Sequence, residues 1–291
     1  MRKVFAFTIT AFLAIGSLHA GNHKTIYMHG LKPFNNLTSC QGQATCSKGW
    51  NAQLYKNSDT LHVGYWTLVN PTYSYNTSSR KSGTVQLLGM LNAHCRRSQG
   101  KSCELICGSM GCYTISYVLA TYNGDRKYNV TAVSALASAE GGSEVANIGT
   151  GLATAVVSAL TNIFGGAITN AVLGASAFGA LRTSYARSRW DHNRNNGTLF
   201  YHKAGDKGLW PFNWIWKGDH DRMVSFHSQC GYREIRKFSR CGGEKVKVGV
   251  FKKRTIYPYT GHYASSRVSR YGIQGAQHGY MSKTSSAQYK R

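Results

Sequence analysis

A lone serine, Ser109, stands at the tip of a small-residue turn between a strand-like and a helix-like run. The turn reads Cys107-Gly108-Ser109-Met110-Gly111; the apolar, β-prone run 104–107 leads into it and the helix-compatible run 113–122 leaves it. A serine on such a tight turn has its Oγ lifted clear of the sheet, and the amides that begin the helix point toward whatever that oxygen attacks. The pattern predicts a serine nucleophile, although Cys107 replaces the usual first glycine.

The first twenty residues have the three-part layout of a secretory signal. Arg2 and Lys3 precede an apolar run over 4–15, and small residues then lead to Ala20. A membrane span needs about 20 apolar residues, so a signal peptide over 1–20, cleaved after Ala20, is favoured over an anchor. The remaining 21–291 is long enough for one large domain with its own core.

Eight cysteines follow this signal, and their spacing fits an oxidising compartment. Proximity in the sequence favours four local disulfides among the many possible pairings: Cys40–Cys46, Cys95–Cys103, Cys107–Cys112 and Cys230–Cys241. Metal binding is the alternative, but no Cys-x-x-Cys pair with matching histidines occurs. We therefore expect a secreted or periplasmic protein with no metal and no other cofactor.

Positive charge is the second unusual feature, with 35 Lys and Arg against 11 Asp and Glu and a net charge of +24. Such a surface attracts anionic membranes or phosphate-rich polymers. For an exported protein, an anionic lipid surface is favoured over nucleic acid as the partner. A basic protein with neither partner is the alternative, and the pattern predicts no oligomeric state.

Strand-like and helix-like runs alternate along the chain. The strand-like runs lie at 24–29, 60–68, 104–107, 128–136, 197–204 and 246–251, and the helix-like runs at 82–97 and 113–122. This alternation predicts an α/β fold with a mostly parallel central sheet and helices on both faces. Ligands of such sheets lie beyond the carboxyl ends of the strands, which is where Ser109 falls.

One segment, residues 145–181, contains no charged residue. Its length would allow a transmembrane helix, but Gly165-Gly166 interrupts it, and Thr, Ser and Asn keep each half only mildly apolar. These features favour a helical cap or lid insertion over 145–190, above the site. Ordinary core helices and membrane insertion are the alternatives.

Four segments, at 27–31, 107–111, 137–146 and 218–224, carry a resemblance to a known family. In that order they resemble the His-Gly turn of the oxyanion hole, the nucleophile turn, the Gly-Ser segment that leads into a lid, and the Gly-x-x-Asp-x-x-Val turn of the acid. The family is that of secreted serine lipases and esterases with the α/β-hydrolase fold. Glu140, where a histidine is common, departs from its pattern.

The resemblance implies one α/β-hydrolase domain over 21–291, with a catalytic acid and then a histidine after Ser109. The spacing from Gly218 to Val224 favours Asp221 as the acid. Two other residues, Asp219 in the same turn and Asp206 in an earlier turn, are the competitors.

The histidine is expected in the small-residue loop 275–281, which favours His278 over the alternative His262. The resemblance further implies that the backbone amides of Leu31 and Met110 hold the oxyanion. The predicted activity is hydrolysis of lipid carboxylic esters through an acyl-enzyme. A phospholipase or acyltransferase at anionic membranes is the first alternative, and an inactive protein that binds membranes or polyanions is the second.

Two further features near the predicted site are open to interpretation. His29, in the His-Gly turn, is interpreted as a structural turn residue rather than a base. The aromatic run 210–216 fits an interfacial patch and packing beneath the acid turn equally well.

Overall fold

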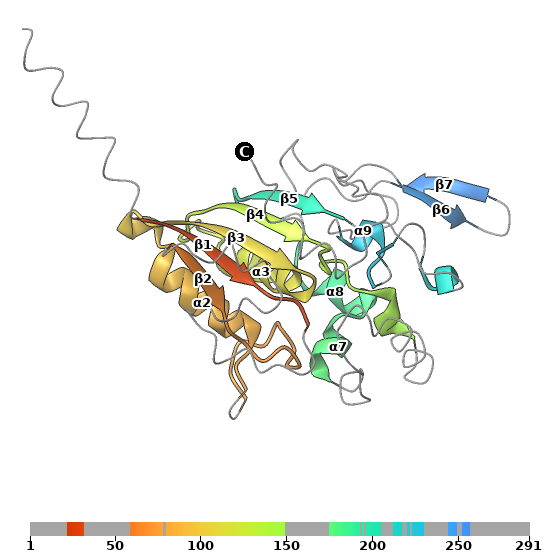
Figure 1. Ribbon diagram of the computed structural model, residues 1–291, viewed down its shortest axis with the longest axis horizontal. Coiled ribbons are helices and arrows are strands. Elements are labelled where there is room, and N and C mark those ends of the chain that lie inside the picture. Colours follow the sequence, from red (N-terminus) through yellow and green to blue (C-terminus); the bar gives the residue numbers. More distant parts are fainter. Residues whose placement is uncertain are drawn as a thin grey trace, which may run out of the picture.

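The computed structural model describes residues 22–31, 59–77, 80–148, 175–192, 194, 196–204, 212–216, 220–221, 223–229, 244–248 and 252–256. Within them, a five-stranded sheet has the order β2-β1-β3-β4-β5, and all of its neighbouring strands run parallel (Figure 1). The strands are β1 (His23–Met28), β2 (Thr60–Val63), β3 (Ser102–Gly108), β4 (Val130–Leu136) and β5 (Leu199–Lys203). The predicted mostly parallel sheet is therefore confirmed.

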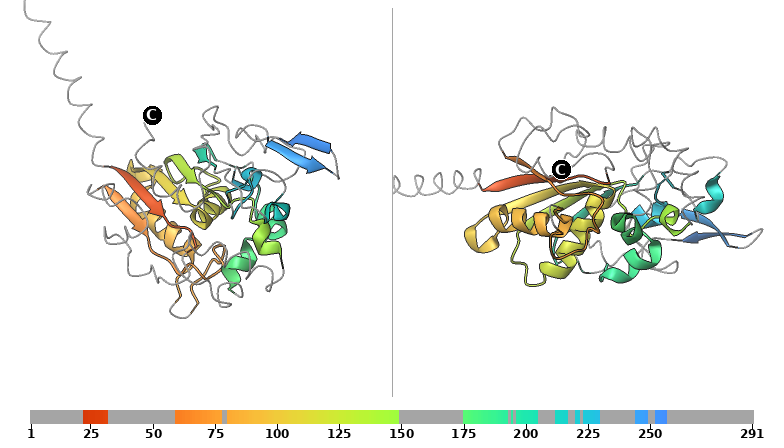
Figure 2. Two further views of the ribbon diagram at one scale, coloured as in Figure 1. Left: turned by 45° about the vertical axis from the view of Figure 1, so that its right-hand side comes forward. Right: turned by 90° about the horizontal axis from the view of Figure 1, so that it is seen from below.

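Two long helices, α2 (Gly83–His94) and α3 (Met110–Tyr122), lie side by side on the same face of the sheet (Figure 2). Ser82 begins α2 because its Oγ accepts a hydrogen bond from the Val85 N–H at 3.2 Å. Helix α3 is buried from Met110 to Ala120, as expected of a helix enclosed on all sides.

The remaining elements are short, and all of them except η4 follow β4 in the chain. They are η4 (Arg97–Gln99), η5 (Glu144–Asn147), α7 (Ser176–Ala180), α8 (Thr183–Arg189), η6 (Phe212–Ile215), α9 (Phe226–Gln229) and the antiparallel pair β6 (Glu244–Val248) and β7 (Lys252–Ile256). Of the predicted cap over 145–190, η5, α7 and α8 are described, and the segment between η5 and α7 lies outside the described residues. None of the described helices is both long and apolar enough to cross a membrane.

Two predicted strands differ in the structure: one is shorter than predicted, and the other belongs to a different sheet. The run 60–68 leaves the sheet after Val63, because the chain then turns: the Trp66 N–H donates to the Lys81 carbonyl at 2.8 Å, and the Val69 N–H to the Trp66 carbonyl at 3.1 Å. The run 246–251 is part of the separate pair β6–β7 and not of the parallel sheet.

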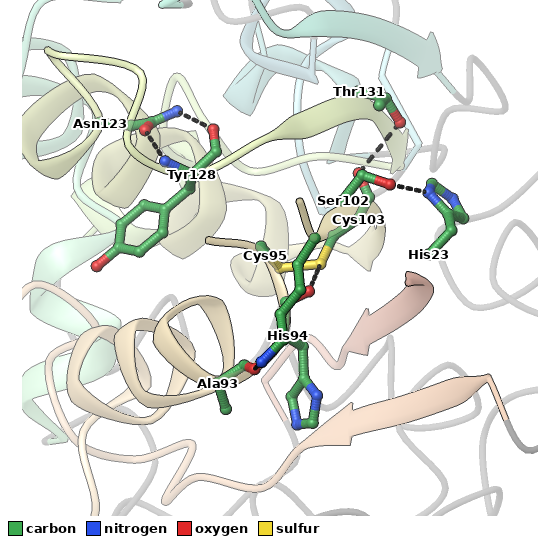
Figure 3. Close-up of a disulfide and its surroundings, with 10 residues drawn as sticks. His23, Ala93, His94, Cys95, Ser102, Cys103, Asn123, Tyr128 and Thr131 are labelled. Carbon is green, nitrogen blue, oxygen red and sulfur yellow. Dashed lines mark hydrogen bonds between the residues drawn. A yellow bond between two sulfur atoms is a disulfide. The ribbon is translucent and has the colours of Figure 1, made fainter. Parts of the chain in front are cut away.

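The amino end of the sheet is closed by covalent and polar contacts (Figure 3). The disulfide Cys95–Cys103 joins the end of α2 to the start of β3. After α3, the Asn123 side chain accepts from the Tyr128 N–H at 2.9 Å and donates to the Tyr128 carbonyl at 3.2 Å, which holds the turn into β4. These contacts fix the end of the sheet opposite to Ser109.

The predicted disulfide pairing is confirmed where the cysteines are described. Cys95–Cys103 and Cys107–Cys112 are both bonded. The other predicted pairs, Cys40–Cys46 and Cys230–Cys241, lie outside the described residues.

Candidate active site

The strand order reverses between β1 and β3, since β2 lies beside β1 whereas β4 and β5 follow β3 on the other side. In open parallel sheets, ligands bind at such a switch point, beyond the carboxyl ends of the two central strands. Two segments meet there: the turn His29-Gly30-Leu31 after β1, and Ser109 after β3. The topology thus places the predicted nucleophile where a parallel sheet forms its binding site.

Ser109 occupies a backbone conformation that non-glycine residues rarely adopt, with φ 50° and ψ −123°. A positive φ costs such a residue about 1–3 kcal/mol, and strain of this kind is concentrated at functional sites. Backbone hydrogen bonds hold the conformation: the Ser109 N–H donates to Leu136 at 3.0 Å, and its carbonyl accepts from Cys112 at 3.1 Å and from Ala139 at 3.2 Å. Ser109 is half-buried, and its side chain makes no capping hydrogen bond to α3.

Two glycines allow the chain to pass close to Ser109. A Cβ on Gly30 would lie 2.6 Å from the Ser109 Cβ and 3.0 Å from the Gly108 carbonyl oxygen. A Cβ on Gly111 would lie 2.5 Å from the carbonyl oxygens of both Met28 and His29. The turn after β1 and the start of α3 therefore pack backbone against backbone around the serine.

The two predicted oxyanion donors flank the serine in this arrangement. Met110 is the first residue of α3, so its N–H belongs to the first turn, where helical N–H groups have no partner within the helix. Leu31 follows Gly30, and the hydroxyl of the buried Tyr65 donates to the His29 carbonyl, which anchors the turn. The ring of His29 is buried and stacks against His62, with 6.3 Å between the ring centroids.

Asp221, the predicted acid, is fully buried in a tight turn just before α9. Its Oδ1 accepts from the N–H groups of Met223 at 2.9 Å and Val224 at 2.8 Å, and its own N–H donates to the Val224 carbonyl at 3.2 Å. A bridge between His220 and Ser225 closes the turn. The competitors Asp219 and Asp206 lie outside the described residues, as do His278 and His262.

The acid turn packs against the loop that follows β4. The Ser143 hydroxyl donates to the Met223 carbonyl, and the Gly141 N–H donates to the Ser228 carbonyl at 3.0 Å. Since Ala139 of the same loop donates to Ser109, a single loop contacts both the serine turn and the acid turn. The structure thus brings these two predicted site elements to the same end of the sheet.

The aromatic run before the acid turn divides between surface and interior. Trp216 is buried and stacks on His220, with 3.9 Å between ring centroids, whereas Trp214 is 65% exposed. Trp216 therefore packs beneath the acid turn, whereas Trp214 faces solvent.

A buried histidine links β5 to the helix that follows the acid turn. The Nδ1 of His202 lies 2.8 Å from the Gln229 carbonyl oxygen, which accepts a hydrogen bond and so requires a proton on Nδ1. Burial lowers the pKa of His202 to about 3, even though the Gln229 hydrogen bond acts in the opposite direction. His202 is therefore a neutral structural residue at physiological pH.

Sequence reasoning missed a cluster of charged and polar side chains beside the acid turn, formed by Glu144, Arg187, Ser225, His227 and Ser228. They come from η5, α8 and the start of α9, so no local motif joins them. The one available signal was that Glu144 is the last charged residue before the uncharged segment 145–181. Among the described residues, no group of three or more His, Cys, Asp or Glu could hold a metal ion.

Comparisons with known proteins give structural matches and no sequence matches. No family model and no curated protein matches the chain. The lipase BlEst2 of Bacillus licheniformis in its mature form superposes with a TM-score of 0.52 at 15% identity, over 91% of this chain and 88% of that one. The metagenomic carboxyl esterase MGS0156 matches 72% of this chain and 60% of that chain, with a TM-score of 0.47 and 15% identity.

At such identities, the BlEst2 superposition establishes the fold and leaves the chemistry to the site itself. The parallel five-stranded sheet with its helices agrees with that superposition. The chain has the α/β-hydrolase fold, as predicted.

Proposed function

We propose that this protein is a serine hydrolase that cleaves carboxylic esters of lipids. The observation that carries the proposal is the strained conformation of Ser109 at the switch point of the sheet, with two segments of backbone packed around it. Glycine would adopt this conformation without strain, and strained residues of this kind are concentrated at functional sites.

In the proposed reaction, His278 accepts the proton of Ser109 while the Ser109 Oγ bonds to the ester carbonyl carbon. Collapse of the tetrahedral intermediate breaks the ester C–O bond, and His278 gives its proton to the departing alcohol. Water then attacks the acyl-enzyme, losing a proton to His278, and the acid is released as Ser109 regains its hydrogen. Asp221 orients the imidazole and stabilises its cation, and His262 is the alternative base.

The oxyanion of each intermediate is proposed to bind the backbone N–H groups of Met110 and Leu31. The position of Met110 at the first turn of α3 and the anchoring of the turn that contains Leu31 support this assignment. One such donor typically contributes about 3 kcal/mol to the transition state.

Lipid esters are the proposed substrate class, and the lipase whose fold this chain shares supports that choice. The net charge of +24 would favour approach to an anionic membrane surface. The two disulfides support export to a secreted or periplasmic location, since such bonds persist in oxidising compartments.

The first test is labelling of the purified, oxidised protein with a fluorophosphonate probe, followed by peptide mapping. Label is expected on Ser109 and on no residue of Ser109→Ala. His278→Ala, which removes the base, and Asp221→Asn, which removes the acid, should each slow labelling roughly 10³-fold or more. His262→Ala is the control for His278→Ala, and Asp219→Asn is the control for Asp221→Asn.

Absence of label on the folded protein, with and without lipid, would overturn the hydrolase proposal in favour of a membrane- or polyanion-binding protein. When Ser109 is labelled, a panel of p-nitrophenyl esters and phospholipids separates esterase from phospholipase activity. Acyl transfer to an added alcohol would identify an acyltransferase.

A further inference from the structure

A buried ionic cluster joins three segments of the chain next to the acid turn. The Oε1 atom of Glu144 accepts from the Ser225 hydroxyl at 2.7 Å and lies 3.3 Å from Nε2 of His227 and 3.5 Å from Nη2 of Arg187. The same Arg187 nitrogen donates to the Ser228 hydroxyl at 3.0 Å. Ser225, His227 and Ser228 are buried, and the Glu144 side chain is only 11% exposed.

On one side, this cluster holds the turn that contains Asp221. Ser225 forms the bridge to His220 that closes the turn, and its hydroxyl is the nearest donor to Glu144. The Val224 carbonyl, which accepts from the Asp221 N–H, also accepts from the Gln229 side chain at 3.0 Å. A shift of Ser225 would therefore move both ends of the turn.

On the other side, the cluster holds the loop that leads back to the serine. Nε of Arg187 donates to the Gly141 carbonyl at 3.0 Å, and the Gly142 N–H donates to the Ala139 carbonyl at 2.9 Å. Ala139 in turn donates to the Ser109 carbonyl. Hydrogen bonds, the backbone of Gly141-Gly142 and the Arg187–Glu144 ion pair thus connect Ser109 through this loop to the acid turn.

A buried carboxylate is a costly way to hold two segments together, because desolvation offsets most of the attraction of its partners. Burial by itself would raise the pKa of Glu144; the hydrogen bond and charge of His227, the charge of Arg187 and the Ser225 hydrogen bond outweigh it and lower the pKa to about 2. Glu144 is therefore ionised at neutral pH. Apolar packing could supply equal stability, but it would not fix the direction of the Ser225 hydroxyl.

From this geometry we propose that Glu144 is a positioning residue that holds the Asp221 turn in register with the loop behind Ser109. The inference rests on the proposed function, in which Asp221 is the acid of the triad. Glu144 itself contacts no reacting atom in this scheme. Its effect on the reaction passes through Ser225 and the acid turn.

The test is a double-mutant cycle on the full, oxidised chain, with the fluorophosphonate labelling of Ser109 as the readout. Glu144→Gln should lower the maximal labelling rate about 10- to 100-fold, the range expected of a misplaced catalytic group, with little change in apparent probe affinity. In the Asp221→Asn background, the same substitution should add almost nothing. Asp59→Asn is the matched control, because it removes a carboxylate from the Lys24 ion pair at the other end of the sheet.

The positioning role would be overturned if the two substitutions lowered the labelling rate additively in the double variant. It would also be overturned if folded Glu144→Gln labelled at the wild-type rate. Either result would leave the proposed function standing. Failure of the wild-type protein to label, or full labelling of Asp221→Asn, would instead overturn the assignments on which the inference rests. If Glu144→Gln does not fold, Ser225→Ala serves in its place. That variant removes the closest donor to Glu144 without leaving a new buried charge.

Discussion

Gly30 shows at the scale of one residue how the site depends on a close backbone approach. The turn after β1 runs so near to Ser109 that a side chain at position 30 would overlap the nucleophile itself. In α2, by contrast, Gly89 is exposed and has no atom within 4 Å of a built Cβ. The two positions carry the same residue type for different reasons, and they form a matched pair.

We predict that Gly30→Ala destabilises the protein by about 1–3 kcal/mol, as overpacking commonly does, and slows Ser109 labelling in the molecules that remain folded. Gly89→Ala should leave labelling unchanged and stabilise the protein by about 0.5–1 kcal/mol, since alanine is the better helix former. Denaturant unfolding and labelling rates measure the two effects. A Gly30→Ala variant that labels at the wild-type rate would contradict the close approach.

At the scale of the element, the strand-turn-helix unit β3–Ser109–α3 is closed by its own disulfide. Cys107 lies on β3 and Cys112 in the first turn of α3, so the bond spans the strained serine. The replacement of the usual glycine by Cys107 is thereby explained, because the position supplies one half of this link. The second disulfide, Cys95–Cys103, joins β3 to α2 at the opposite end of the strand.

Removal of either disulfide should destabilise the protein by about 2–3 kcal/mol, since both close short loops. Only the pair Cys107→Ala and Cys112→Ala should also slow labelling of Ser109 per folded molecule, because the turn can then relax from its positive φ. The pair Cys95→Ala and Cys103→Ala is the control. Equal labelling by both folded variants would show that backbone hydrogen bonds alone hold the serine.

At the scale of the whole molecule, the chain has few carboxylates for its number of basic residues. The chain has 11 Asp and Glu against 35 Lys and Arg, yet it places Glu144 in the interior as the partner of Arg187 and His227. The pKa of Glu144 is lowered from 4.5 to about 2 by these partners and Ser225 against the opposing effect of burial. As the pH falls, the unfolded chain therefore takes up this proton before the folded chain does.

The contribution of Glu144 to stability is thus complete above about pH 4.5 and is lost as the pH falls toward about 2. We predict that the free energy of unfolding of the wild-type protein falls more steeply over this range than that of Glu144→Gln. The difference should be on the order of 3 kcal/mol, since one pKa unit is worth about 1.4 kcal/mol. Urea unfolding at a series of pH values measures it, and parallel pH profiles would refute the assignment.

Local sequence was sufficient to predict the unit around Ser109. The apolar run, the small-residue turn and the helix-compatible run lie within twenty residues, so their structure depends on short-range preferences, and β3 and α3 form as expected. The same holds for Cys95–Cys103 and Cys107–Cys112, whose partners are close in the chain. The assignments of Asp221, His278, Leu31 and Met110 to catalytic roles remain predictions that the labelling experiments test.

The tertiary structure decided what depends on distant segments. The strand order, which brings the turn after β1 beside Ser109, has no local signal, and neither does the end of β2 at Val63. The cluster of Glu144, Arg187 and His227 joins residues up to 83 positions apart, and each of them alone resembles an ordinary surface residue in the sequence. The sequence by itself determines side-chain chemistry and short-range propensity. The burial and pairing of a charge are determined only by the tertiary structure, because they depend on how distant segments pack.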